Sequence, residues 1–402
     1  MNTKELQATV NPSFTTAKSI LNMLIAGGDA DALKLAPHLN LSNISKSETE
    51  KKIPPEMLNC FKIGQMAKFD IHNSAVLKSG KPTIIDLPCG YATRCFKVAD
   101  NGQKYYGLDL PIVIDEMKEL TSKIMTEKQK ELITFKAVDA TNYNSMRQAL
   151  SDVKGEICII TEGLLAYFND SELICLCKGI HKLLSEFGGC WITADGCEIK
   201  QIYPLTIGVL FQGDKEKVSK IMQKVSDEKS QVHSGINALT SNKGANAREF
   251  MENQGFIIKK ESVSKYLDKL KCCPEDKQEA LFNAYSKLNI WTMTVDKKDE
   301  IFTNEYIFNL ESNLEDGVFK IKISGRLDTL TAPELLKKFK ENEGIKQILV
   351  DVSKMTFISS AGLRVLEIML KELNNKEMFE IIGANEKIKE IMKNSELHLN
   401  MK

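Results

Sequence analysis

The sequence predicts an α/β protein in which a mostly parallel sheet, covered by helices on both faces, is followed by a second, smaller α/β unit. Apolar runs typical of strands alternate with helical segments between about residues 83 and 195. This alternation implies parallel pairing through right-handed crossovers. The run 157–160 is apolar at every position, which suits a sheet buried on both faces. A charged run at 296–300 then separates a second alternating segment.

Length and charge narrow the class of protein. The 402 residues allow two or three domains, and the 43% hydrophobic content is enough for a real core. The formal net charge is +0, so no overall field attracts nucleic acid or an anionic membrane. No apolar run approaches the roughly 20 residues of a membrane span, and no secretory signal is visible. We therefore expect a cytoplasmic protein that binds neither nucleic acid nor membrane.

The ten cysteines and five histidines do not indicate a metal site. No cysteine pair has the spacing of a zinc ribbon or finger, and the histidines are scattered. We expect reduced thiols that pack as small hydrophobic side chains, and no bound metal.

The first domain is expected to span residues 1–298. Residues 1–78 have helical spacing without strand alternation, and we interpret them as a helical cap. Strands are predicted at 83–87, 104–108, 132–138, 156–161, 189–195, 256–263 and 288–295, with helices from about 91 and at 111–124, 143–151, 170–186 and 246–254. The alternation stops at 196–244, which favours a helical insertion or lid. Asn169 and Glu172 have the spacing of a capping box for the helix at 170.

The turn after the first predicted strand has the features of a nucleotide-type site. That strand ends in Asp86 and is followed by a turn containing Gly90, and the second strand ends in Asp109. A glycine turn lets the backbone approach a ligand, and the second acid can accept hydrogen bonds from a ribose diol. A dinucleotide-dependent dehydrogenase needs the same two features. This turn has one glycine rather than the G-x-G-x-x-G spacing, which argues against that alternative.

Three motifs in this region resemble one enzyme family. Ile85-Asp-Leu-Pro-Cys-Gly-Tyr, Tyr106-Gly-Leu-Asp-Leu-Pro111 and Ile160-Thr-Glu-Gly-Leu-Leu-Ala-Tyr167 together look like the leucine carboxyl methyltransferase family, over roughly residues 10–296. The resemblance implies a Rossmann-like class I methyltransferase that depends on S-adenosylmethionine and methylates a carboxylate or a hydroxyl. The motifs do not name the substrate.

The resemblance also implies roles for individual residues. Gly90 would let the methionine part of the cofactor approach the turn, and Asp109 would bind the ribose hydroxyls. The neighbourhood of Asp139 would frame the adenine, and Glu162 would lie near the cofactor's amino-acid end. Lys68 falls where the family commonly has an arginine that binds the cofactor carboxylate. A lysine keeps the positive charge but lacks the planar guanidinium that can donate two parallel hydrogen bonds.

Two further residues are candidates for binding the methyl acceptor. Arg94 is placed to pair with a carboxylate of the substrate or the cofactor, and Tyr167 to line the pocket, although a tyrosine at a strand end also serves packing. A carboxylate acceptor needs no general base but needs a cation, for which Arg94 and Lys68 are candidates. A hydroxyl acceptor needs a base, and the sequence identifies no catalytic residue. Asp86 has the alternative role of capping the turn or the following helix.

The second unit is expected at residues 303–402. Strands are predicted at 317–325, 348–352 and 378–382, with helices from about 331, from about 360 and at 385–393. Gly325-Arg-Leu-Asp-Thr, Val350-Asp-Val-Ser and Phe357-Ile-Ser-Ser-Ala-Gly-Leu-Arg364 resemble the STAS domain, the fold of bacterial anti-sigma factor antagonists. The resemblance implies that Ser360 is at the phosphoacceptor position, while Ser359 replaces the aspartate of phosphorylated members. Either serine also suits an ordinary helix N-cap.

The two resemblances together predict a bacterial fusion protein. Its methyltransferase domain would act on an unknown small-molecule or protein acceptor, and its STAS domain would bind a partner such as an anti-sigma or serine kinase protein. Phosphorylation of Ser360 would change that binding and so gate the methyltransferase. The alternative is a non-catalytic protein that binds S-adenosylmethionine and acts as an anti-anti-sigma-type interaction module.

Overall fold

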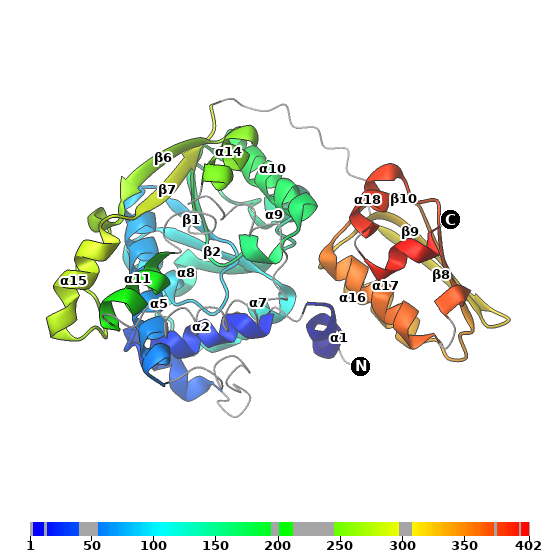
Figure 1. Ribbon diagram of the computed structural model, residues 1–402, viewed down its shortest axis with the longest axis horizontal. Coiled ribbons are helices and arrows are strands. Elements are labelled where there is room, and N and C mark those ends of the chain that lie inside the picture. The colour runs from blue at the N-terminus through cyan, green and yellow to red at the C-terminus, as the bar shows by residue number, and fades with distance from the viewer. Residues whose placement is uncertain are drawn as a thin grey trace. The chain divides into compact units, whose positions relative to one another are not determined.

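The computed structural model describes residues 3–11, 14–39, 55–193, 201–211, 245–296, 308–373, 376–393 and 395–401 (Figure 1). The chain forms two compact units. The larger unit comprises Ser13–Asp109 and Val113–Asp299, and the smaller comprises Met1–Pro12, Leu110–Ile112 and Glu300–Lys402.

A seven-stranded sheet forms the centre of the larger unit, in the order β3-β2-β1-β4-β5-β7-β6. Its strands are β1 (Thr83–Asp86), β2 (Lys104–Asp109), β3 (Ile133–Ala137), β4 (Ile157–Thr161), β5 (Gly189–Thr193), β6 (Ile257–Ser262) and β7 (Asn289–Thr294). The first five pair in parallel, and β7 is antiparallel to both β5 and β6. The strand order reverses between β1 and β4, which is where α/β sheets bind ligands at the carboxyl ends of their strands.

Helices cover both faces of this sheet. The helices are α2 (Phe14–Ala26), α3 (Ala30–Leu35), α5 (Pro55–Lys78), α6 (Arg94–Asp100), α7 (Pro111–Ser122), α8 (Glu127–Leu132), α9 (Tyr143–Ala149), α10 (Asp170–Phe187), α11 (Ile202–Leu210), α14 (Ala245–Asn253) and α15 (Glu275–Tyr285). Helices α9, α10 and α14 share one apolar core with the sheet (Figure 1). Helices α5 and α6 also pack on the strands. The burial of β1 and β4 at every position follows from this double cover.

The smaller unit is built on a four-stranded sheet in the order β11-β10-β9-β8. Its strands are β8 (Asn309–Glu315), β9 (Val318–Leu327), β10 (Gln347–Ile358) and β11 (Phe379–Ile382), and its helices are α1 (Thr3–Val10), α16 (Ala332–Lys340), α17 (Ser360–Glu372) and α18 (Glu386–Met392). Strand β10 is parallel to β9 and β11, while β8 and β9 form an antiparallel hairpin. The predicted fold class, a mostly parallel α/β sheet followed by a small α/β unit, is confirmed.

Several elements differ from expectation. Strand β8 and helices α8 and α15 were not predicted from the sequence, and of the expected insertion at 196–244 only α11 and the adjoining Gln201 and Phe211 lie within the described residues. Helix α1 packs into the core of the smaller unit, although we expected it in the helical cap of the first domain. Helical periodicity shows that a helix has an apolar face but does not say which core receives it.

No helix within the described ranges combines the length and the apolar character that crossing a bilayer requires.

Candidate functional site

The turn after β1 and the acid that ends β2 are joined in the structure. Gly90 has a φ of +51°, a left-handed conformation that glycine adopts at little cost. Its amide donates to Asp109 Oδ2 at 2.8 Å, and the Cys89 amide donates to the Leu108 carbonyl at 3.0 Å. The carboxylate of Asp109 therefore fixes the turn at the carboxyl end of the sheet, and the expected glycine and acid lie side by side.

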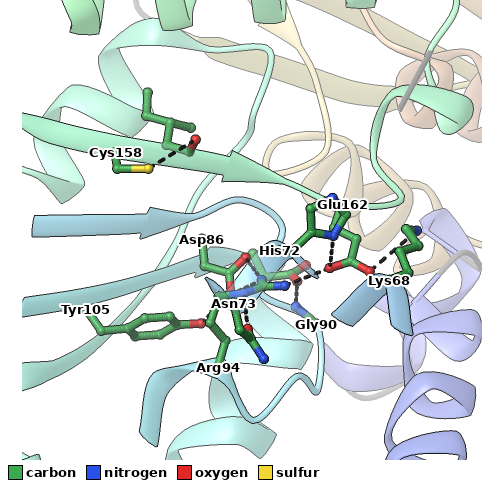
Figure 2. A network of polar contacts seen from close by, with 11 residues as sticks. Lys68, His72, Asn73, Asp86, Gly90, Arg94, Tyr105, Cys158 and Glu162 are labelled. Carbon is green, nitrogen blue, oxygen red and sulfur yellow. Dashed lines mark hydrogen bonds and ion pairs between the residues drawn. The ribbon is translucent and has the colours of Figure 1, made fainter. Parts of the chain in front are cut away.

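Glu162, which follows β4, lies among three basic side chains (Figure 2). Arg94 Nη2 donates to its Oε2 at 2.7 Å, and Lys68 Nζ lies 3.4 Å from its Oε1. The ring of His72 brings Nδ1 within 3.1 Å of Oε2, but without hydrogen-bond geometry. Lys68 and His72 are four residues apart on α5, so both side chains lie on one face of that helix.

The electrostatic environment keeps Glu162 ionised. Burial alone would raise its pKa, but interactions with the neighbouring Lys68, His72 and Arg94 outweigh burial and hold the pKa well below its usual range. Within the described part of the chain, no hydrogen bond reaches Glu162 Oε1. A buried acceptor that stays unsatisfied costs about 1–3 kcal/mol. This oxygen is therefore suited to accept from a donor on a bound ligand.

Arg94 forms a buried network of hydrogen bonds and ion pairs next to this cluster. Its side chain is 2% exposed. Its Nη1 donates to both oxygens of Asp86, at 2.8 and 2.7 Å, and its Nε donates to Asn73 Oδ1 at 2.9 Å. The Tyr105 hydroxyl donates to Asp86 Oδ2 at 2.9 Å. Burial raises the pKa of Asp86, and its contacts with Arg94 and Tyr105 limit that rise.

These contacts differ from the roles that we expected for Arg94 and Asp86. We expected Arg94 to be placed for a substrate or cofactor carboxylate, but all three of its nitrogens already donate to Asp86, Glu162 or Asn73. Asp86 was considered as a cap of the turn or of the next helix. Its carboxylate instead accepts from Arg94 and Tyr105. Both residues are therefore buried in the protein interior, where they hold Glu162 and its neighbours in position.

The remaining candidates lie at other strand ends. Asp139 Oδ1 accepts from the amide and the hydroxyl of Thr141, at 2.6 and 2.5 Å, so it shapes the turn after β3. Tyr167 is half-buried at the end of a short 3₁₀ helix, Leu165–Tyr167. Cys89 is buried, and burial raises the pKa of its thiol, which argues against a nucleophilic role.

Sequence reasoning missed three members of the cluster, which are His72, Asn73 and Tyr105. The spacing of Lys68 and His72 was a usable signal, because two basic residues four apart inside a mostly apolar helix share a face. Tyr105 gave no signal, since a tyrosine in a strand usually serves packing.

In the smaller unit, the two serines have separate places. Ser359 is the N-cap of α17, and its Oγ accepts from the Gly362 amide at 3.2 Å. Ser360 is the first residue of the helix and is half-buried. A Cβ on Gly362 would come within 2.5 Å of the Leu327 carbonyl oxygen, so only glycine lets α17 start this close to β9. The N-cap alternative is thus confirmed for Ser359.

Comparison with known proteins identifies this smaller unit. The STAS domain family matches residues 309–402. The anti-sigma-B factor antagonist of Staphylococcus aureus is 31% identical over 84 residues, which are 20% of this chain and 77% of that protein. The chain belongs to the STAS domain family. The STAS unit supplies the four-stranded sheet, and Ser359 and Ser360 stand at the start of its helix α17.

Solved structures with a similar fold include methyltransferases. A duf574 family protein from Streptomyces avermitilis is 11% identical and covers 62% of this chain and 89% of its own, with a TM-score of 0.41. Human N-acetylserotonin methyltransferase, solved in complex with SAM, is 12% identical and covers 68% of this chain and 70% of its own, with a TM-score of 0.33.

Proposed function

We propose that the larger unit is an S-adenosylmethionine-dependent methyltransferase that methylates an oxygen, of a carboxylate or a hydroxyl, and that the STAS unit regulates it through protein binding. The observation that carries the proposal is the ionised Glu162, whose buried Oε1 has no hydrogen bond within the described residues. It follows β4 next to the point where the strand order reverses, the usual ligand crevice of such a sheet.

The residues around the turn fit the polar groups of this cofactor. Glu162 Oε1 suits the ammonium group of an amino acid, and the Nζ of Lys68, 3.4 Å away, suits the carboxylate beside it. Asp109, held by the Gly90 amide, stands where a ribose diol is bound in nucleotide sites. When bound, the cofactor supplies a methyl group that is already activated on a sulfonium. The chain's own residues then have to bind, orient the acceptor and exclude water.

The contacts of Arg94 and Lys68 bear on which cation could bind an acceptor carboxylate. Of the two cations considered for an acceptor carboxylate, Arg94 already donates to Asp86, Glu162 and Asn73, and Lys68 pairs with Glu162 next to the place proposed for the cofactor carboxylate. A carboxylate acceptor needs no proton transfer, whereas a hydroxyl needs a base. The preference for oxygen rests on the leucine carboxyl methyltransferase resemblance. Products methylated only on nitrogen would contradict it.

The regulatory part of the proposal rests on the STAS unit. The staphylococcal relative is named an anti-sigma-B factor antagonist, so we propose an anti-sigma or serine kinase protein as the partner. Ser360 is the proposed phosphorylation site, because a phosphate at a helix N-terminus is favoured by the helix dipole and nearby amides. Equal partner binding by Ser360→Ala and Ser360→Asp variants would remove this part of the proposal.

Calorimetric titration with S-adenosylmethionine tests the enzyme part. We expect the wild-type chain to bind, and Asp109→Ala to weaken binding by about 10- to 100-fold, the loss of one or two hydrogen bonds to a charged group. Asp268→Ala is a matched control, since Asp268 is exposed and lies outside the cluster. A folded wild-type chain that does not bind would refute the proposal. Binding without formation of methylated product from any oxygen acceptor would favour the non-catalytic alternative.

A further inference from the structure

Helix α1 packs against α16 and α17 within the smaller unit. Leu6 is 4% exposed and Val10 is fully buried, and both belong to the apolar core of that unit. Glu5 and Thr9 are exposed. The two buried residues are four positions apart, so they form a single apolar stripe along the helix. We call the part of α16 and α17 that this stripe covers the α1-binding surface.

Helix α1 lies outside the segment that matches the STAS family. That match begins at residue 309, and α16 and α17 both fall within it. Helix α1 is formed by Thr3–Val10, and the residues of the larger unit come between it and the match in the sequence. The α1-binding surface is therefore part of the STAS domain itself, whereas the helix that covers it is an addition.

The C-terminal end of α1 is held through its backbone. Arg364 of α17 donates from Nη1 to the Val10 carbonyl, which is one of the last four carbonyls of the helix and has no acceptor role inside it. A cation at this end of a helix also interacts favourably with the helix dipole. Asn11 Nδ2 donates to the Thr329 carbonyl at 3.4 Å. The contact from Arg364 recognises the end of a helix rather than a side chain, so it suits other helices that end at this point.

Few contacts hold α1 in place. It has eight residues, and isolated helices shorter than about 12–15 residues are marginal in water. Among the α1 side chains that the structure describes, Leu6 and Val10 are the two that are buried. The helical state of α1 therefore depends on docking. A partner helix that is already folded avoids this ordering cost, and so it competes well for the same surface.

We propose that the α1-binding surface is where the STAS unit binds a helix of its protein partner, and that α1 occupies this surface until the partner displaces it. The partner helix would have two apolar side chains four positions apart and would end with a free carbonyl beside Arg364. The inference rests on the proposed function only in that the STAS unit binds a protein. It does not require the larger unit to bind a cofactor.

A helical peptide of residues 3–11 is the probe for this surface. Its side chains at positions 5 and 9 are replaced by a hydrocarbon link, because both positions are exposed and they are four residues apart. The link holds the peptide helical and leaves Leu6 and Val10 free to dock. Fluorescence anisotropy measures the binding of the labelled peptide to the full chain.

The peptide should distinguish a covered surface from an open one. Leu6→Asp with Val10→Asp places charge on the buried side of α1 and should release it. We expect this double variant to bind the peptide about tenfold more tightly than wild type or better, as for a surface open in no more than roughly one wild-type molecule in ten. Thr9→Asp changes an exposed position and should behave like wild type. Adding Arg364→Ala to the double variant should weaken peptide binding by about tenfold, the loss of a hydrogen bond from a charged group.

Hydrogen exchange follows the displacement of α1 directly. With saturating peptide, the amides of α1 in the wild-type chain should exchange faster than without it. A linked peptide that carries Leu6→Asp and Val10→Asp should leave their exchange unchanged. Unchanged α1 exchange with the unmodified probe bound would refute displacement.

The other outcomes also decide the inference. If the peptide does not bind the double variant while calorimetry shows a folded STAS unit, the surface does not accept a helix and the inference is wrong. Equal affinity for wild type and the double variant would show that α1 does not block the surface. A wild-type dimer that becomes monomeric in the double variant would mean that the surface takes α1 from a second copy. Should the double variant lose the STAS transition, Leu6→Ala with Val10→Ala takes its place and the same comparisons apply.

These measurements are independent of the enzyme part of the proposed function, because none of them involves S-adenosylmethionine. A chain that binds no cofactor would remove the proposed methyltransferase and leave this inference standing. A chain that binds cofactor but whose double variant does not bind the peptide would remove only this inference.

Discussion

Replacing Arg94 with alanine should strongly destabilise the larger unit. Asp86 would keep only the Tyr105 hydroxyl as a side-chain donor among the described residues, although its carboxylate is completely buried. Removing one partner of a buried ion pair costs about 3–5 kcal/mol. A domain of roughly this size loses about 2–4 °C in Tm per kcal/mol, so we expect a drop of about 6–20 °C.

Differential scanning calorimetry of the full chain measures this drop, and the transition of the STAS unit serves as an internal reference. Arg94→Lys keeps the positive charge but not the guanidinium that reaches both Asp86 and Glu162. Its drop in Tm should therefore be smaller than that of Arg94→Ala. The loss in Arg94→Ala should also shrink at acidic pH, because an unpaired buried Asp86 takes up a proton more readily. A Tm within 1 °C of wild type, or a drop independent of pH, would refute the reasoning.

Two further predictions concern single groups. Ser359→Ala should reduce the stability of the STAS unit by about 1 kcal/mol, because α17 loses its N-cap; urea unfolding checks this, and Ser359→Asp, which can also cap, should restore most of it. Glu162 has a pKa below its usual range in the folded protein, so its stabilising contribution is present above the pKa of an unfolded glutamate and is lost as pH falls through the folded value. The difference in Tm between wild type and Glu162→Gln should therefore shrink on acidification from pH 7; a difference that grew would contradict the assignment.

Local signals were enough to predict most of the larger unit. Strands β1 and β4 are continuous apolar runs, and the predicted bounds lie within one residue of those observed. The capping box at Asn169 and Glu172 is present with both of its hydrogen bonds. These features depend on neighbours within a few residues, and so the sequence pattern carries them.

Features that depend on distant partners could not be predicted in the same way. Strand β8 is mostly exposed and polar, with Leu310 and Leu314 as its partly buried apolar positions, because it lies at the edge of its sheet. The sequence indicated Arg94 as a residue that binds a carboxylate but not its partners within the chain, since only the fold brings Asp86 and Glu162 to either side of it. The binding roles of Gly90 and Asp109 remain predictions.

The docking of α1 also imposes an order on folding during synthesis. Val10 and Arg364, which share a hydrogen bond, are 354 residues apart in the chain. Domains generally fold from the N-terminal side while the rest of the chain is still being made. Helix α1 leaves the ribosome well before α17, so it has no site to dock on until α17 has been made. Leu6 and Val10 therefore stay exposed while the 354 residues from Val10 to Arg364 are being made, and their burial marks a chain whose STAS unit has been synthesised.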